Sequence, residues 1–259
     1  RRYHDSGQYQ TSAGPHVLAD GSHVGYYDDQ TDNYLQKNYQ LLLNHSFSTA
    51  WNLNVALHYT KGDGYYEEYK PGSSLVEYGL KPFNPDGTET NESDLVRQKK
   101  MDNKFGGGVF SLNYTGNRLT ASLGGGLNQY RGNNFGKVTW VKNYIGNLSP
   151  EHEYYRNKSK KTDGNIYLKA NYDLTSTLSA YADLQYRHID YTIDGVNDKY
   201  DWNKNALRPL AVDKKFDFFN PKVGLNWNIT PNHRLYASFS VAQKEPTRNN
   251  YTDGDPDSY

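Results

Sequence analysis

The amino-acid sequence predicts an all-β fold, an antiparallel up-and-down transmembrane β-barrel segment of about eight strands in four hairpins. Three observations predict it: apolar and polar residues alternate along several stretches, short turns alternate with long polar connections, and the chain holds 25 tyrosines. Mean hydropathy is only −0.96. A barrel strand points every second side chain at lipid and the others at water, so a low mean hydropathy is compatible with crossing a bilayer.

Composition excludes several other classes of protein. The 29 basic and 29 acidic side chains give a net charge of zero, so the chain has no basic excess that would attract nucleic acid. It has no cysteine, which excludes disulfides and cysteine-based metal sites. No apolar stretch approaches the ~18 residues that a membrane-spanning helix needs. The eight histidines form no ligand pair, so we expect no metal and no cofactor.

The clearest alternation runs from Trp51 to Thr60. Trp51, Leu53 and Val55 fall on one face of an extended chain, and the polar Asn52 and Asn54 fall on the other. Such a period of two sorts residues cleanly in a strand and scatters them around a helix. Similar alternation predicts strands at about 35–46, 51–60, 104–114, 119–130, 164–173, 178–188, 218–229 and 234–243.

The same alternation predicts which side chains face lipid and which face the lumen. The residues expected to face lipid include Leu53, Val55, Leu123, Leu168, Leu184, Leu225 and Phe239. The residues expected to face the lumen are Asn54, His58, Lys169, Asp183, Arg187 and Asn226. A slip of one residue in register would exchange the two sets, so the pattern specifies the register strongly.

The connections predict the orientation of the sheet. Short turns at one end contrast with polar connections at 61–103, 131–163 and 189–217, which we interpret as long extracellular loops. Compact soluble domains rarely contain several loops of this length, whereas outer-membrane barrels have short periplasmic turns and long extracellular loops. The expected organisation is therefore an extracellular loop at 1–33, a barrel segment at 34–252 and a polar loop end at 253–259.

Large aromatic side chains mark two further features. Trp51, Tyr114, Tyr172 and Trp227 each stand beside a short turn, where a membrane aromatic girdle would lie. General enrichment of Tyr and Trp in strands is the alternative. In the long loops, rings that could contact a ligand, or simply pack the loops together, are Tyr65, Tyr66, Trp140, Tyr144, Tyr154, Tyr155 and Trp202.

Two groups of acidic residues have less specific patterns. Asp253, Asp255 and Asp257 have the alternate spacing of a calcium loop, but the following glycine and the distal glutamate are missing, which favours a solvated turn. Glu67 and Glu68 are adjacent and could be a pair of catalytic carboxylates, but no nucleophile or base accompanies them. We interpret them as loop charges and predict that the protein is not an enzyme.

The most specific motifs lie near the C-terminus, in the stretch 218–248. It reads Asn-Pro-Lys-Val-Gly-Leu at 220–225, a Thr-Pro-Asn turn at 230–232, Leu-Tyr-Ala-Ser at 235–238 and Lys-Glu-Pro at 244–246. This succession resembles the barrel of TonB-dependent receptors, and the stretch 58–69 resembles a strand-to-loop passage of the same family. The resemblance covers about 34–252.

The resemblance implies a receptor in the bacterial outer membrane that imports a scarce nutrient, such as a glycan or a siderophore. It implies a 22-stranded barrel filled by a plug domain, so the partners would be the lipid bilayer, the plug, the remaining strands, TonB and a small ligand. About eight strands would then be an internal barrel fragment lacking the plug domain. Two alternatives are a small self-contained barrel acting as an adhesin or anchor, and a soluble β-sandwich carbohydrate-binding module.

Overall fold

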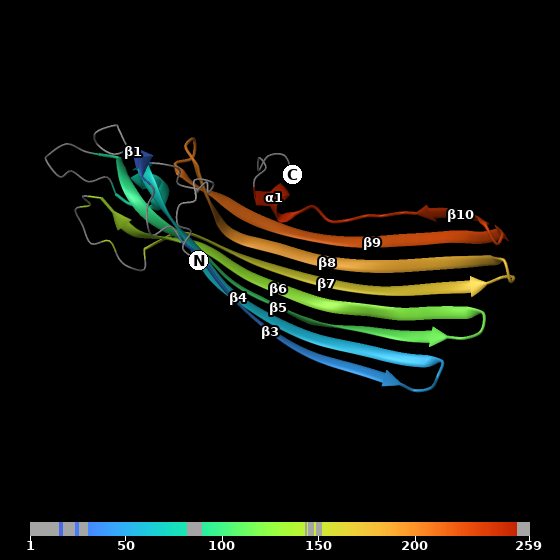
Figure 1. Ribbon diagram of the computed structural model, residues 1–259. Helices are drawn as coiled ribbons and strands as arrows, with labels where there is room; N and C mark the ends of the chain where they lie inside the picture. The colour runs from blue at the N-terminus through green and yellow to red at the C-terminus, as the bar shows by residue number, and fades with distance from the viewer. Residues whose placement is uncertain are drawn as a thin grey trace.

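A single antiparallel sheet of eight strands dominates the computed structural model, which describes residues 16–17, 24–25, 31–81, 90–142, 144, 148 and 152–252 (Figure 1). Each strand pairs with its neighbours in sequence, which confirms the predicted all-β up-and-down fold. The strands are β3 (Thr31–Ser46), β4 (Trp51–Ser74), β5 (Glu92–Thr115), β6 (Leu119–Val141), β7 (Glu153–Asp173), β8 (Leu178–Asp201), β9 (Ala206–Thr230) and β10 (His233–Ser240).

The remaining elements are short. The strands β1 (His16–Val17) and β2 (Val24–Gly25) pair with each other, η1 (Leu75–Tyr78) follows β4, and α1 (Arg248–Thr252) follows β10. Over the ranges that the structure describes, neither helical element is long and apolar enough to span a membrane. The chain therefore builds its architecture almost entirely from the eight-stranded sheet.

The sheet is open at two edges within the described residues, because β3 pairs only with β4 and β10 only with β9. The long strands curve along their length (Figure 1). The eight strands do not divide into two stacked sheets, as a β-sandwich would require.

The register gives the sheet one apolar and one polar face. Residues directly opposite each other in neighbouring strands share a face. Leu53 lies opposite Leu112, Leu112 opposite Leu123, and Leu123 opposite Leu168. This row defines the apolar face, on which large side chains are exposed; Leu123 and Leu168, for example, are 39% and 47% exposed.

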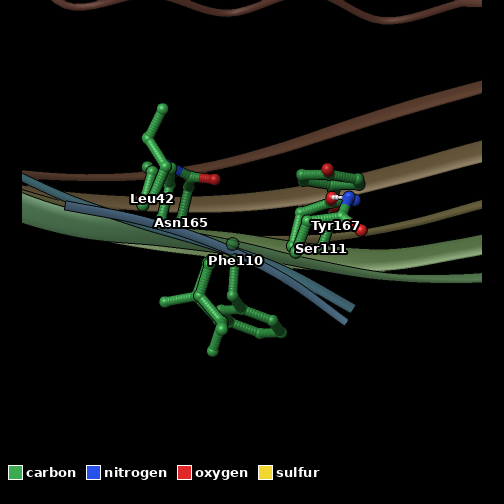
Figure 2. A pocket seen from close by; sticks show the side chains of 12 residues that line it. Leu42, Phe110, Ser111, Asn165 and Tyr167 are labelled. Atoms are coloured by element: carbon green, nitrogen blue, oxygen red, sulfur yellow. Dashed lines mark hydrogen bonds between the residues drawn. The ribbon is translucent and has the colours of Figure 1, made fainter. Parts of the chain in front are cut away.

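Figure 2 shows the two faces at the centre of the sheet. Phe110 extends from one side, whereas Leu42, Ser111, Asn165 and Tyr167 lie on the other. These residues line a hollow with a volume of about 640 Å³. Tyr167 lies over a glycine in the neighbouring strand.

That glycine, Gly124, is needed for close packing. A Cβ atom there would lie 2.8 Å from the carbonyl oxygen of Phe110 and would also overlap the Tyr167 hydroxyl. Any larger residue would push the Tyr167 ring off the polar face. The glycine run at 124–126 is thus explained, at this position, by close contact between neighbouring strands.

The strands extend much further than their alternation predicted. β4 to β9 contain 21 to 25 residues each, and pairing continues beyond the expected end of β4, from Lys61 opposite Lys104 to Lys70 opposite Leu95. The predicted loops at 61–103, 131–163 and 189–217 are therefore wrong over much of their length. Alternation fades there because both faces carry polar residues, while the backbone ladder needs no apolar side chain.

Burial is concentrated where these strand extensions lie. One buried cluster joins η1 to β5, β6 and β7, and a second joins β8 to β9. The first contains Leu75, Tyr78, Leu80, Leu95, Val138, Val141, Tyr154 and Tyr155. The second contains Ile189, Tyr191, Ile193 and Leu210. The middle of the apolar face has no such cover within the described residues.

Candidate functional site

The polar face bears an ion-pair network that connects β7 and β8 to the segment after β10. Arg187 on β8 bonds to Asp163 on β7, with 2.5 Å between Nη2 and Oδ2. The same guanidinium places Nη1 3.0 Å from Oε2 of Glu245, and Lys161 forms a second ion pair with Glu245. Two strands, β7 and β8, and the 241–247 segment are thereby joined through the carboxylate of Glu245.

Local electrostatics keep Glu245 charged. Burial alone would raise the pKa of its carboxyl, but the hydrogen bond from Lys161 and the nearby charge of Arg187 outweigh burial and lower that pKa. A lowered pKa means that the folded arrangement favours the carboxylate over the protonated acid. Glu245 is therefore an anionic anchor for the segment that leads to α1.

The segment encloses a pocket against the polar face. The pocket has a volume of about 440 Å³, within the range typical of small-molecule sites. Its walls combine tyrosine rings, an amide and cations from β6, β7, β8 and the end of the chain. The lining residues are Tyr130, Asn134, Lys161, Tyr191, Glu245, Pro246, Thr247 and Arg248.

Arg248 is the cation of this pocket that a ligand could engage. Its Nη2 donates to Oδ1 of Asn157 at 2.8 Å, and Asn157 in turn donates to the backbone oxygen of Val196 at 3.0 Å. The guanidinium forms no ion pair with any described side chain. Lys161, in contrast, is already paired with Glu245. The pocket thus presents one uncompensated positive group beside two tyrosines, Tyr130 and Tyr191.

A second network lies nearer the β4–β5 connection. Glu68 is only 1% exposed, and Arg97 donates to its Oε1 through Nε at 2.5 Å and to the Tyr78 hydroxyl at 3.2 Å. Lys70 Nζ lies 3.8 Å from the other carboxylate oxygen. Glu68 is therefore a buried partner of Arg97 in a paired strand, and the interpretation of Glu68 as a loop charge is wrong.

The aromatic residues expected at a ligand site do not form one cluster. Tyr154 and Tyr155 are 7% and 8% exposed inside the first buried cluster, and burial raises the pKa of both phenols. Tyr144 packs partly buried against the same cluster. Only Tyr144 and Trp202 lie outside strands; the other five expected loop aromatics lie on strand extensions.

The four more exposed rings are divided between locations. Trp140 stacks on Tyr69 at 6.4 Å on the side of the apolar face, and Trp202 meets Tyr200 at 4.9 Å beside the β8–β9 turn. Lys100 Nζ lies 4.7 Å from the Tyr65 ring, and Lys99 Nζ lies 5.9 Å from the Tyr66 ring. The four rings therefore lie on different surfaces of the sheet and do not form a common site.

The residues predicted to face the lumen share the polar face. His58 Nε2 lies 2.8 Å from Oδ1 of Asn128, Asn54 donates to Ser111 at 3.3 Å, and Lys169 lies 3.7 Å from Asp183. Arg187 and Asn226 occupy the same face by register. No cluster of three metal-binding side chains occurs in the part of the chain that the structure describes.

The residues expected in an aromatic girdle share the apolar face beside the short turns. Trp51 lies opposite Tyr114, with ring centroids 4.8 Å apart. Tyr172 lies opposite Leu119, and Trp227 opposite Leu178. By register, Trp51 and Tyr114 share one row, whereas Tyr172 lies two residues and Trp227 four residues nearer the short turns.

Sequence reasoning missed the pocket residues, although a signal for part of them was present. Continuing the alternation of β7 and β8 past Asp163 and Ile189 would have put Lys161 and Tyr191 on the polar face. The contribution of Glu245 and Arg248 depends on how the chain folds back after β10, which no local pattern encodes.

Comparison with known proteins matches this architecture to one family. The family model described as "TonB dependent receptor-like, beta-barrel" matches residues 1–257. No curated protein matches the chain. Among solved structures, the ferric-catecholate import receptor Fiu from E. coli K12, in its open form, aligns with a TM-score of 0.61 at 13% identity, covering 88% of this chain and 38% of that one.

Two further receptors have a similar fold. The ferric yersiniabactin uptake receptor FyuA from Yersinia pestis gives a TM-score of 0.53 at 9% identity, covering 83% of this chain and 29% of that one. The siderophore receptor PiuA from Acinetobacter baumannii gives 0.50 at 12% identity, covering 82% and 33%. The chain thus spans well under half the length of these structures, and at such identities the likeness shows the fold alone. On the match over 1–257, the chain belongs to the TonB-dependent receptor-like β-barrel family.

Proposed function

We propose that the chain forms part of a receptor that takes up a scarce nutrient through the bacterial outer membrane, with energy delivered by TonB to a plug domain. The observation that carries this proposal is the division of one curved sheet into an exposed apolar face and a polar face with ion pairs and a pocket. A membrane barrel requires an apolar exterior and a polar interior on the two faces of the same strands.

In this proposal the apolar face contacts lipid and the polar face borders the lumen. Trp51, Tyr114, Tyr172 and Trp227 form the aromatic girdle at the periplasmic boundary. Lys169, Asp183 and Arg187 face the lumen, where water and a plug can solvate their charges. The strand extensions beyond the apolar face then project from the cell, and the short turns lie in the periplasm.

We propose that the pocket beside Arg248 takes an anionic ligand, with a siderophore or its iron complex as the first candidate. The named receptors of similar fold import or bind ferric complexes and siderophores. An arginine fork suits carboxylate and phenolate oxygens, and Tyr130 and Tyr191 offer rings and hydroxyls. The half-buried ring of Tyr65 and the exposed rings of Tyr66, Trp140 and Trp202 are proposed as earlier contacts on the outside.

The test uses the full-length receptor in a strain that lacks other iron receptors. Uptake of radioactive iron is measured with a catecholate complex and with a carboxylate complex, for the wild type, Arg248→Gln and Lys244→Gln. We expect Arg248→Gln to reduce uptake of at least one complex about tenfold, equivalent to ~1.4 kcal/mol, and Lys244→Gln to leave it unchanged. Wild-type transport of neither complex would contradict the iron-siderophore proposal, and equal uptake by both variants would contradict the role of Arg248.

A further inference from the structure

A row of five cations crosses the apolar face at its outward end. Lys37 lies opposite Lys61, Lys61 opposite Lys104, Lys104 opposite Arg131, and Arg131 opposite Lys160. The row, hereafter the cation row, therefore occupies one position on each of five consecutive strands, β3 to β7. Four strand spacings of ~4.8 Å make it about 19 Å long.

The cation row marks the end of the apolar band. On β4, Trp51, Leu53, Val55, Leu57 and Tyr59 precede Lys61 on the same face. On β5, β6 and β7, only apolar or uncharged side chains separate the apolar residues from Lys104, Arg131 and Lys160. Each cation is thus the first charged side chain met beyond the band on its strand, and all five are exposed.

The height of the band fits a bilayer. Ten residues separate Trp51 from Lys61 and also separate Tyr114 from Lys104. At ~3.3 Å per residue this is about 33 Å along the strand, and a tilt of ~40° reduces it to about 25 Å, the usual height of an outer-membrane apolar band. If Trp51 marks the inner boundary, Lys61 lies at the outer one.

Strand tilt also explains why the five cations lie at different distances from the outer boundary of the apolar band. A row perpendicular to tilted strands climbs across the membrane surface from one strand to the next. On β3 the apolar face continues past Lys37 to Leu35, whereas on β7 Gly164 and Thr162 intervene between Ile166 and Lys160. Lys37 and Lys61 are therefore nearest the apolar band. Arg131 lies four residues beyond Leu127, and Lys104 and Lys160 lie six residues beyond Phe110 and Ile166.

The protein does not neutralise the cation row within its described residues. None of the four lysines has an ion pair, and Arg131 donates only to Gln129, at 2.8 Å. Three acidic residues lie near the row on this face. Asp63 and Asp102 lie opposite each other one step further out, and Asp190 lies on β8 opposite Thr162; none of them forms an ion pair with the row. Like charges directly opposite in a sheet are destabilising, so this arrangement calls for an external anion.

The cation row ends at β7, because other side chains occupy the corresponding region of β8 and β9. On β8 and β9 the first titratable groups beyond the apolar residues are His188 and Asp217, whose Nδ1 and Oδ1 lie 2.7 Å apart. Thr192 occupies the position of the row on β8, opposite Lys160. The positive strip is thus confined to one sector of the outward surface.

We propose that the cation row binds phosphate groups on the headgroups of lipids in the outer leaflet. The proposal rests on the membrane orientation proposed above. Tyr39 and Tyr59, one step inside the row with ring centroids 6.4 Å apart, supply the amphipathic rings expected at the interface. The long lysine stems can lie along the apolar band while the ammonium groups reach the phosphates.

The test measures how strongly two labelled lipids associate with the full-length receptor in bilayers of phosphatidylcholine. Spin-labelled phosphatidic acid, which carries a phosphate monoester, is compared with spin-labelled phosphatidylcholine for the wild type and for Lys37→Gln/Lys61→Gln/Lys104→Gln. The matched control is Lys81→Gln/Lys204→Gln/Lys244→Gln, which removes three exposed lysines elsewhere. We expect the wild type and the control to prefer phosphatidic acid about fivefold, and the row variant to lose that preference.

Three outcomes separate the possibilities. Insertion of the receptor into the bilayer without any preference for phosphatidic acid would overturn this inference and leave the proposed function standing. Failure to insert at all would overturn both. Displacement of phosphatidic acid by inorganic phosphate, but not by chloride at equal ionic strength, would show a site for free anions and overturn the assignment to lipid.

Discussion

Glu245 is bound to Arg187 across the polar face, with Nη1 and Oε2 3.0 Å apart, although the two residues lie 58 positions apart in the chain. Lys161 completes the contact from the neighbouring strand. This carboxylate is one of the points at which the segment leading to α1 is attached to the sheet, and it forms one wall of the candidate pocket.

Replacing Glu245 by Gln should therefore loosen the segment without unfolding the sheet. The change removes the negative charge that Lys161 and Arg187 share, while Arg187 keeps Asp163. We expect hydrogen exchange of the amides in Arg248–Thr252 to increase, and exchange in β7 and β8 to stay the same. Lys244→Gln is the control. Unchanged exchange in α1 would show that other contacts hold it.

The same carboxylate predicts a dependence on pH. The folded-state pKa of Glu245 lies below its ordinary value of 4.5, so its contribution is complete above that value and is lost as pH falls through the lowered pKa. Asp163, Lys161, Arg187 and Arg248 are the charged groups around it. A spin label at position 250 should become more mobile on acidification in the wild type. In Glu245→Gln it should be mobile at every pH, and a persisting transition would contradict this assignment.

The two faces predict opposite effects for the same substitution at adjacent positions. Leu184→Arg puts a charge in the middle of the apolar face and should destabilise the full-length receptor in bilayers by ~2–4 kcal/mol. Gln185→Arg puts it on the polar face and should change stability by less than about 1 kcal/mol. Urea unfolding in lipid vesicles measures both. Similar losses for both variants would refute the assignment of faces.

The buried pair of Glu68 and Arg97 predicts a local cost in stability. Arg97→Met leaves a carboxylate that is 1% exposed with Lys70, at 3.8 Å, as its ion-pair partner. Removing one member of a buried pair typically costs ~3–5 kcal/mol, and removing both is often close to neutral. Thermal unfolding should therefore show a large loss for Arg97→Met and recovery in Arg97→Met/Glu68→Met. Without recovery, packing of the arginine stem is the dominant contribution.

How far the sequence predicts a strand depends on whether the two faces of that strand lie in different environments. Between Trp51 and Tyr59 one face is apolar and the other polar, so alternation indicates both the strand and its register. Beyond Lys61 that contrast ends, and the prediction of a loop was wrong although the backbone pairing continues to Lys70. A ladder of backbone hydrogen bonds leaves no trace in side-chain patterning.

The candidate site was harder to predict for a different reason. Tyr154 and Tyr155 read as exposed loop rings, but η1 returns over the strands and buries them against Tyr78, whose ring lies 4.8 Å from that of Tyr154. The pocket at Arg248 depends on the segment after β10 folding back. Both are tertiary contacts between distant parts of the chain, and local propensity does not specify such contacts.

The most direct test of the central claim, that one face of this sheet contacts lipid, is a scan of lipid accessibility along β4. The chain has no cysteine, so spin labels can be attached at single cysteines placed from position 51 to position 65 of the full-length receptor in bilayers. We predict high oxygen collision rates at odd positions from 51 to 59, low rates at even positions, and access to a water-soluble relaxation agent from position 61 outward. Equal oxygen accessibility at odd and even positions would contradict the claim.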